Sequence, residues 1–105
     1  SADGKLIACA VEEANTVILI DADSLAQLAV IPVKGKNPEH AVFSPDGKWL
    51  YVSAENTDKV DVIDVAKRTQ VDSIQVGERP RGIGFLPDSS RAYVASEIAS
   101  MVYVI

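Results

Sequence analysis

The chain has 105 residues, of which 48% are hydrophobic and 24% are charged, as is typical of a soluble globular domain. Its net charge of −5 argues against nucleic-acid binding, which needs a basic face, and no apolar stretch approaches the length of a membrane span. No signal peptide is recognisable, although a leader upstream of Ser1 is compatible with a chain that begins inside a motif. A single cysteine and a single histidine exclude an intrachain disulfide and do not support a zinc site.

A blade-sized repeat runs through the whole chain. The sequence Ser-Ala-Asp-Gly-Lys at 1–5 returns as Ser-Pro-Asp-Gly-Lys at 44–48 and, more weakly, as Leu-Pro-Asp-Ser-Ser at 86–90. This period of about 42 residues is the spacing of a four-stranded propeller blade. We therefore predict an all-β fold, a β-propeller fragment of roughly 2.5 antiparallel blades. The blade repeats are expected at 1–43, 44–85 and, incompletely, at 86–105.

The strands follow in chain order, three in the first unit, four in the second and three in the third. In the first unit the run Leu6–Val11 precedes a β-branched run at 17–21, and Cys9 within it is expected to be a small buried hydrophobe. The middle unit carries strands at 39–43, 48–53, 59–64 and 70–76, and the third ends in a matching run at 102–105. The first unit lacks its innermost strand and the third lacks its outermost strand.

The packing layers and turns follow from the same register. We expect the layer between blades to contain five apolar residues of the middle unit, closed at the inner end by two phenylalanines: Val62, Ile63, Val71, Ile74 and Val76, with Phe43 and Phe85. The aromatic residues Trp49, Tyr51 and Tyr93 are expected to pack in the core rather than to form a ligand cage. Gly4 and Gly47 supply positive φ in equivalent turns, where Ser89 must use another geometry or tolerate strain.

The best-matching segments resemble the YVTN-type β-propeller repeat. The family's Tyr-Val-Thr-Asn motif corresponds to Tyr51–Ala54 and Tyr93–Ser96. Its Val-Gly-x-x-Pro motif, which leads into the next blade, corresponds to Val76–Pro80. Within that family, residues 76–97 are most similar to propeller proteins encoded beside pyrroloquinoline-quinone-dependent dehydrogenases. The resemblance implies a seven-bladed parent protein, exported to the periplasm or cell surface, in a redox or surface-layer setting.

Candidate site residues gather at one mouth of the expected central channel. Loops entering the innermost strands carry His40, Arg79 and Arg81, and loops between second and third strands carry Glu55 and Glu97. His40 is interpreted either as a metal or haem ligand or as an exposed or hydrogen-bonded histidine. The arginines would grip a carboxylate or phosphate, or pair with a neighbouring acid, for which Glu55, Glu78 and Glu97 are the candidates. The recurring glutamates, with Glu12, would hold a cation or serve the repeat structurally.

No catalytic signature and no cofactor motif is evident, and the ligand is unknown. The leading interpretation is a non-enzymatic binding or scaffold module, exported and linked to redox catabolism or the cell surface. The alternatives are a cofactor-carrying redox propeller, of the haem d1 or quinoprotein-subunit type, and a lactonase-like hydrolase. Because the end blades are incomplete, the expected partners are further copies of the chain or the remaining blades of a larger propeller.

Overall fold

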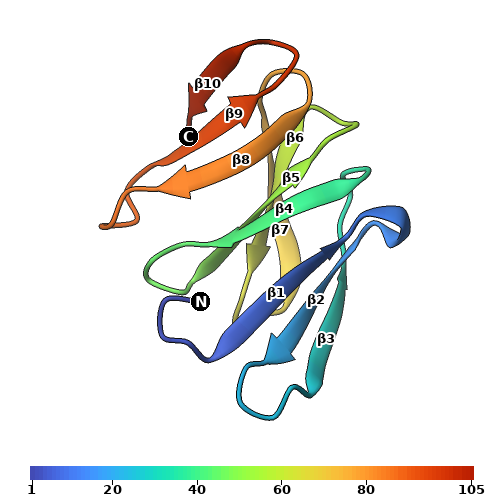
Figure 1. Cartoon of the computed structure of the whole chain (residues 1–105), viewed down its shortest axis with the longest axis vertical. Coiled ribbons are helices and arrows are strands. Elements are labelled where there is room, and N and C mark those ends of the chain that lie inside the picture. Colours follow the sequence, from blue (N-terminus) through green and yellow to red (C-terminus); the bar gives the residue numbers. More distant parts are fainter.

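The computed structural model describes residues 1–105 and contains three antiparallel sheets (Figure 1). The first sheet contains β1 (Leu6–Val11), β2 (Thr16–Asp21) and β3 (Gln27–Pro32), with the 3₁₀ turn η1 (Glu12–Ala14) between β1 and β2. The second contains β4 (Pro38–Phe43), β5 (Trp49–Ala54), β6 (Lys59–Asp64) and β7 (Thr69–Gln75). The third contains β8 (Pro80–Phe85), β9 (Ala92–Ser96) and β10 (Met101–Val104). The predicted all-β propeller fragment is therefore confirmed. No helix is long and apolar enough to span a membrane.

Two apolar layers hold the three sheets together, and β4 contacts both β1 and β8 (Figure 1). The layer between the first and second sheets is made by seven buried residues: Val17, Leu19, Ile31, Val33, Leu50, Val52 and Ile63. The layer between the second and third sheets is made by five: Val60, Val76, Ile83, Ala92 and Val94. The second sheet thus buries both of its faces, while the first and third each leave one face open, as expected for consecutive blades.

The predicted packing layer is correct except at one position. Val62, Ile63 and Val76 are buried, and Ile74 packs against the second layer. Val71, however, is 48% exposed, so its predicted burial is wrong. The pairing of β6 with β7 shifts register between Val62 and Ile63, and this bulge skips Val71. A bulged residue is unpaired and leaves the alternation of the strand, and the side chain consequently points to solvent.

The predicted burial of Cys9 is also wrong, because its thiol is exposed. In β1 the side chains alternate, and Ala8 faces the first apolar layer while Ile7 and Cys9 face the other side of the sheet. That other side carries no neighbouring sheet. An apolar run alone does not say which of its residues face a covered surface.

The aromatic residues divide between the core and the surface. Tyr51 packs against the second apolar layer and meets Phe85 edge-to-face, with ring centroids 4.8 Å apart. Trp49 and Tyr93 are 37% and 38% exposed, so the expectation of core packing is wrong for these two. Tyr93 alternates with Ala92 and Val94 of the second layer and therefore faces away from it, whereas Trp49 shares a face with Tyr51 but lies at the first residue of β5, beyond the buried part of the layer.

The third repeat of the Asp-Gly turn keeps the geometry of the first two. Gly4 and Gly47 have φ of 72° and 75°, and Ser89 takes a φ of 63° at the equivalent position. The turn therefore tolerates left-handed backbone at a non-glycine residue, which costs about 1 kcal/mol in an ordinary case. Ser89 Oγ also accepts the N–H of Asp46 at 3.0 Å, a contact that glycine could not make.

Phe85→Ala is expected to lower the free energy of unfolding by about 2–3 kcal/mol, less than the ~3–5 kcal/mol of a fully buried phenylalanine. The reason is that Phe85 is only partly buried, although it packs on Tyr51 and the second apolar layer. Urea denaturation followed by circular dichroism measures the change. A loss below about 0.5 kcal/mol, the range of ordinary surface substitutions, would contradict this packing.

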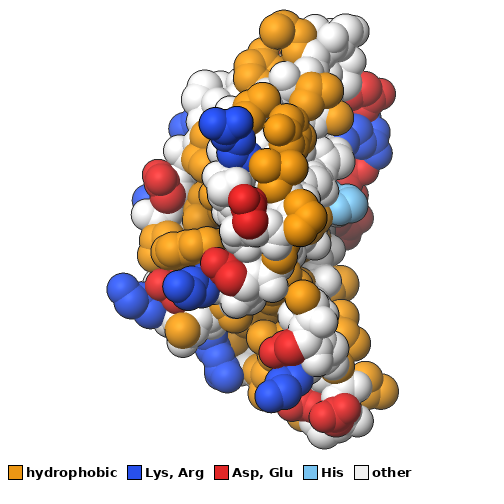
Figure 2. All heavy atoms as spheres, turned by 90° about the vertical axis from the view of Figure 1, so that its left-hand side faces the viewer, with side chains coloured by type: hydrophobic (Ala, Val, Ile, Leu, Met, Phe, Trp, Pro, Cys, Tyr) orange, Lys and Arg blue, Asp and Glu red, His pale blue; other side chains and the backbone are white.

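The isolated chain is expected to be an oligomer or only marginally stable. Both outer sheets leave an apolar face open, and four exposed residues lie on or beside β10: Ile98, Met101, Val102 and Val104. Figure 2 shows hydrophobic side chains gathered over the upper part of the molecule, where Figure 1 places the third sheet. Such faces and edges invite association. Sedimentation equilibrium with thermal melting tests this, and a strict monomer that melts cooperatively above about 60 °C would refute it.

Candidate functional site

The two loops that lead into the inner strands, from β3 to β4 and from β7 to β8, are held by the same backbone contacts. Asn37 and Arg79 take left-handed φ values of 56° and 57°. Their carbonyl oxygens accept the N–H groups of Glu55 at 3.1 Å and Glu97 at 3.0 Å. In each of these blades, the loop between the second and third strands is therefore bonded to the entry loop, which leads into the first strand of the same blade. The recurrence of glutamate at positions 55 and 97 accordingly brings both carboxylates to the same end of the molecule.

In each entry loop, a side-chain oxygen from the preceding blade accepts one more backbone N–H. Asn15 Oδ1 accepts the N–H of Asn37 at 2.9 Å, and Asp58 Oδ1 accepts the N–H of Arg79 at 3.4 Å. Asparagine adopts the left-handed region readily, whereas arginine does so at a cost. The hydrogen bonds on both sides of Arg79 hold its backbone in this conformation and aim its side chain at the neighbouring blade.

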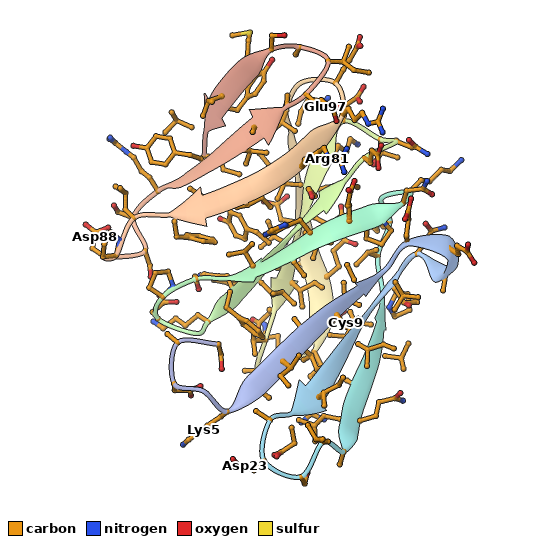
Figure 3. The ribbon with its side chains drawn as sticks, in the orientation of Figure 1. Lys5, Cys9, Asp23, Arg81, Asp88 and Glu97 are labelled. Atoms are coloured by element: carbon orange, nitrogen blue, oxygen red, sulfur yellow. The ribbon has the colours of Figure 1, made fainter.

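Two arginines and three glutamates form a clamp between the second and third sheets, here called the Arg–Glu clamp: Glu39, Glu55, Arg79, Arg81 and Glu97. Arg79 pairs with Glu55 and lies 3.4 Å from Glu97 Oε2 through its Nε atom. Arg81 pairs with Glu39 of β4 and donates from Nη1 to Glu97 Oε2 at 2.9 Å. Arg81 and Glu97 lie at the end of the third sheet opposite Asp88 (Figure 3). The clamp therefore ties adjacent blades together through the ion pairs of Arg79 and the charge-assisted hydrogen bonds of Arg81.

Two carboxyl groups of the clamp, those of Glu39 and Glu55, shift one another's pKa. The hydrogen bond between Glu39 and Glu55 raises the pKa of Glu39, and burial and the charge of Glu55 act in the same direction. The same hydrogen bond lowers the pKa of Glu55, assisted by Arg79 and Arg81. Glu39 Oε2 is buried without a hydrogen-bond donor, so a proton on this carboxyl group would satisfy it.

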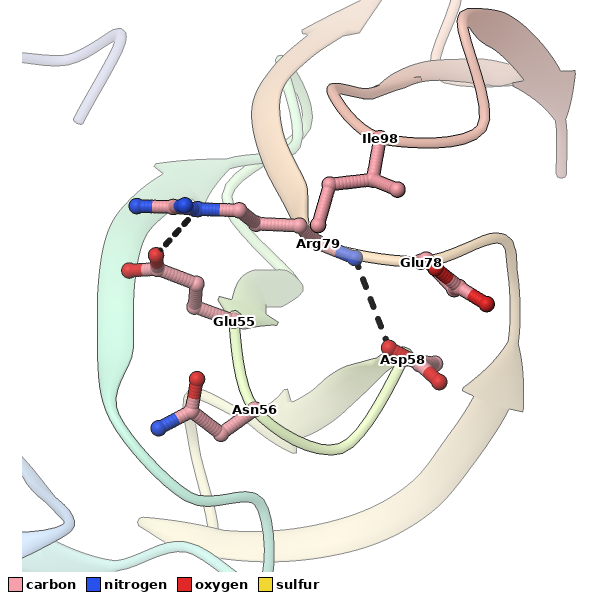
Figure 4. A pocket seen from close by; sticks show the side chains of 6 residues that line it. All are labelled: Glu55, Asn56, Asp58, Glu78, Arg79 and Ile98. Carbon is pink, nitrogen blue, oxygen red and sulfur yellow. Dashed lines mark hydrogen bonds and ion pairs between the residues drawn. The ribbon is translucent and has the colours of Figure 1, made fainter.

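An open hollow of about 540 Å³ adjoins the clamp (Figure 4). It is lined by Glu55, Asn56, Asp58, Glu78, Arg79 and Ile98. The Arg79 side chain extends toward Glu55, while its backbone nitrogen faces Asp58. The hollow is predominantly polar, and its one guanidinium group is already engaged by carboxylates.

Of the five predicted site residues, the structure brings four together in the Arg–Glu clamp, namely Glu55, Arg79, Arg81 and Glu97. His40 follows Glu39 on β4, but its side chain is exposed and its imidazole makes no hydrogen bond or ion pair. No group of His, Cys, Asp or Glu side chains is arranged to hold a metal ion. The clamp offers ion pairing, and a bound anion would have to displace a glutamate from an arginine.

Sequence reasoning did not select Glu39 and Asp58. Glu39 is the second residue of β4, and its pairing with Arg81 joins residues of two different blades. Asp58 had a usable signal, since it is the repeat equivalent of Asn15 and both side chains accept an entry-loop N–H. Recurrence of an Asx residue three positions after the loop glutamate would have predicted this role.

Glu39→Gln is expected to flatten the pH dependence of stability above about pH 4.5, the usual pKa of glutamate. A pKa raised on folding means that the native state holds the proton more tightly, so this contribution is full below the unfolded value and lost as the pH rises through the folded value. Glutamine keeps a hydrogen-bond donor toward Glu55 and does not titrate. Unfolding free energies of the wild type and the variant, measured from pH 4 to 8, check this prediction. A variant with the wild-type pH profile would contradict the raised pKa of Glu39, and Glu78→Gln serves as the control.

The fold and the repeated interblade contacts define a β-propeller segment. A family model described as a seven-bladed β-propeller lactonase family matches residues 1–71. The chain belongs to this lactonase-type seven-bladed β-propeller family. A comparison with curated protein sequences returned no match.

Several solved structures share the fold. Hydrazine synthase of Kuenenia stuttgartiensis superposes with a TM-score of 0.95 at 31% identity, over 100% of this chain and 30% of that one. A candidate 6-phosphogluconolactonase from Bacteroides fragilis gives 0.86 at 23%, over 97% and 32% of the two chains. A dihydro-haem d1 dehydrogenase gives 0.81 at 18%, over 97% and 22%. The chain thus spans about a third or less of each of these proteins.

Proposed function

We propose that the chain is a segment of an exported seven-bladed propeller that acts as a binding scaffold in a redox system, without catalytic activity of its own. The observation that carries this proposal is the Arg–Glu clamp. Arg79 and Arg81, the strongest candidates for gripping a substrate, are both paired with glutamates, and these pairs link neighbouring blades. Side chains that stabilise the ring are suited to hold a rigid surface.

The similarity to hydrazine synthase supports the redox setting, because it extends over the whole chain at 31% identity. The YVTN-type segments, and their likeness to propellers associated with pyrroloquinoline-quinone-dependent catabolism, point to the same setting. Export to the periplasm or cell surface is part of this proposal and follows from that resemblance. Fold alone does not transfer an activity, so the proposal depends on the site.

The test is purification of the tagged full-length protein from its native host. We expect it to co-purify with a cofactor-bearing redox protein, to localise outside the cytoplasm, and to show no visible absorption once separated from that partner by salt. Salt weakens the charged contacts of such a surface. A visible cofactor retained by the separated propeller would overturn the scaffold proposal in favour of a cofactor-carrying subunit.

A lactonase-like hydrolase is the second candidate, favoured by the family match over residues 1–71. It predicts hydrolysis of δ-lactones by the purified protein, and 6-phosphogluconolactone is the first substrate to assay. Turnover that is lost in an Arg81→Ala variant with unchanged folding would establish the hydrolase and overturn the scaffold proposal. Lactone hydrolysis indistinguishable from the spontaneous rate would exclude it.

A further inference from the structure

A hollow of about 250 Å³, here called the lysine hollow, lies between the first and second sheets. Its lining comes from the entry loop after β3, from the loop between β5 and β6, and from β6 and β7: Lys34, Gly35, Thr57, Lys59 and Ser73. Each of the four side chains is polar and none is acidic. Two lysines that face one hollow without an acid are unusual in a chain whose net charge is −5. The lining therefore favours an anion.

The blades on both sides of the lysine hollow are present in this chain. Lys59 lies on the same face of β6 as Ile63 of the first apolar layer, because side chains alternate along a strand. Ser73 is paired with Asp61, which also lies on that face. The first sheet covers this face, and its outer strand β3 contacts β7. Further blades would adjoin the open faces of the first and third sheets, so the hollow does not result from their absence.

The repeat does not require the polar residues of the lysine hollow. Lys34 is the extra residue that makes this entry loop one residue longer than the next one. The counterparts of Thr57 in the other units are alanines, and those of Lys59 are a threonine and a methionine. These counterparts are Ala14 and Ala99 for Thr57, and Thr16 and Met101 for Lys59. A blade can thus be built without them, and their meeting at one place points to a ligand.

The donors of the lysine hollow are free to bind. All four ion pairs of the chain involve Arg79 or Arg81, so neither Lys34 nor Lys59 is paired with an acid. The Thr57 hydroxyl donates only a long hydrogen bond of 3.4 Å, to a backbone carbonyl of β5. It can turn its proton into the hollow at little cost. The hollow therefore offers two ammonium groups and one hydroxyl.

The entry loop that carries Lys34 is held in place before any ligand binds. Gln70 Oε1 accepts the N–H of Lys34 at 2.8 Å, and Asp61 Oδ2 accepts the N–H of Gly35 at 2.7 Å. Asp61 is completely buried behind the lining, and its other oxygen accepts Gln70 Nε2 and Ser73 Oγ. A loop fixed in this way loses little freedom when it binds.

We propose that the lysine hollow binds a phosphate-class oxyanion, held between the ammonium groups of Lys34 and Lys59 with the Thr57 hydroxyl as third donor. Lysine binds phosphate as a point charge, and hydrogen bonds between charged groups are the strong ones. The ligand is inorganic phosphate or the phosphate group of a small ester, since both present the same oxygens. The site is separate from the Arg–Glu clamp and independent of the proposed scaffold function.

The test is calorimetric titration of the full protein at pH 8 with three probes: inorganic phosphate, methyl phosphate and, as a singly charged comparison, acetate. The ionic strength is kept constant, because salt screens exposed charges. A phosphate monoester, with a second pKa of about 6, carries two charges at this pH. We expect both phosphates to bind saturably and about tenfold more tightly than acetate. Tighter binding of inorganic phosphate indicates the free ion, and equal or tighter binding of methyl phosphate indicates an ester.

Lys34→Gln and Lys59→Gln are each expected to weaken phosphate binding by about tenfold, since each removes one charged donor. Thermal melting confirms that a variant folds, and either variant decides the question if the other does not fold. The matched control is Lys67→Gln, which removes the same charge from the turn after β6, at the opposite end of that strand. Its affinity should change less than about twofold.

Three results would overturn the proposal. One is the absence of saturable phosphate binding, and another is acetate binding as tight as that of phosphate. The third is an affinity in a folded Lys34→Gln or Lys59→Gln variant that falls no further than in Lys67→Gln, because the anion would then be attracted only by the general charge of the protein.

Discussion

Asp61→Ala is expected to lower the free energy of unfolding by about 4 kcal/mol, because three buried or half-buried donors lose their common acceptor. Asp61 is completely buried in β6, between the first and second sheets. Its Oδ2 accepts the N–H of Gly35 at 2.7 Å, and its Oδ1 accepts Gln70 Nε2 at 2.8 Å and Ser73 Oγ at 2.7 Å. One carboxylate thus joins an entry loop, β6 and β7.

Two variants separate this network from a general effect of removing charge. Asp61→Asn keeps one acceptor oxygen but turns an NH₂ group toward a donor, and a loss of about 1–2 kcal/mol is expected. Asp72→Ala removes an exposed carboxylate from β7 that bonds only the next N–H, and a change within about 0.5 kcal/mol is expected. Urea unfolding of the three variants gives the comparison. Equal effects of Asp61→Ala and Asp72→Ala would show that the network does not stabilise the fold.

The sequence predicted the elements of the fold well because the repeat aligns every strand with a counterpart. The Ser-Pro-Asp-Gly-Lys turn and its copies placed ten strands in three sheets, and the structure has them. Burial was harder to predict at particular residues. Val71 fell on a bulge, and Cys9 fell on a face without a neighbouring sheet. Neither a bulge nor the absence of a neighbour is encoded in a local hydrophobic pattern.

The candidate site was predictable only where it repeats. Glu55 and Glu97 recur at one blade position, and the pairing of Arg79 and Arg81 with a neighbouring acid was one of the two interpretations. Of the acids expected to pair with the arginines, Glu55 and Glu97 do so and Glu78 does not, whereas Glu39, which was not among them, reaches Arg81 from another blade. Asp61 has no counterpart, since Ile18 and Tyr103 hold its position in the other units. Its donors come from residues 26 positions before it and 9 and 12 positions after it, which a local pattern does not reveal.

Gly35→Ala is expected to lower the free energy of unfolding by about 3 kcal/mol, because the site has no room for a methyl group. A Cβ atom on Gly35 would lie 2.2 Å from the Cβ atom of Ala54 and 2.6 Å from Asp61 Oδ2. The Ala54 side chain cannot rotate away, since its Cβ is fixed by the backbone of β5. The entry loop would have to move, and its hydrogen bond to Asp61 would be lost with it.

Two other glycines provide matched comparisons for Gly35→Ala. Gly77 is the equivalent residue of the next step, but its Cβ would meet the ring of Tyr103, with Oη at 2.6 Å. Tyr103 lies on β10 at the edge of the third sheet and can shift, so Gly77→Ala is expected to cost about 1 kcal/mol. Gly82 has open space around its Cβ position and a negative or extended φ, and Gly82→Ala is expected to be neutral or to stabilise by about 0.5 kcal/mol. In urea unfolding, the loss of unfolding free energy should therefore be largest for Gly35→Ala, smaller for Gly77→Ala and smallest for Gly82→Ala. Equal losses for Gly35→Ala and Gly82→Ala would mean that the entry loop is not packed tightly against β5 and Asp61.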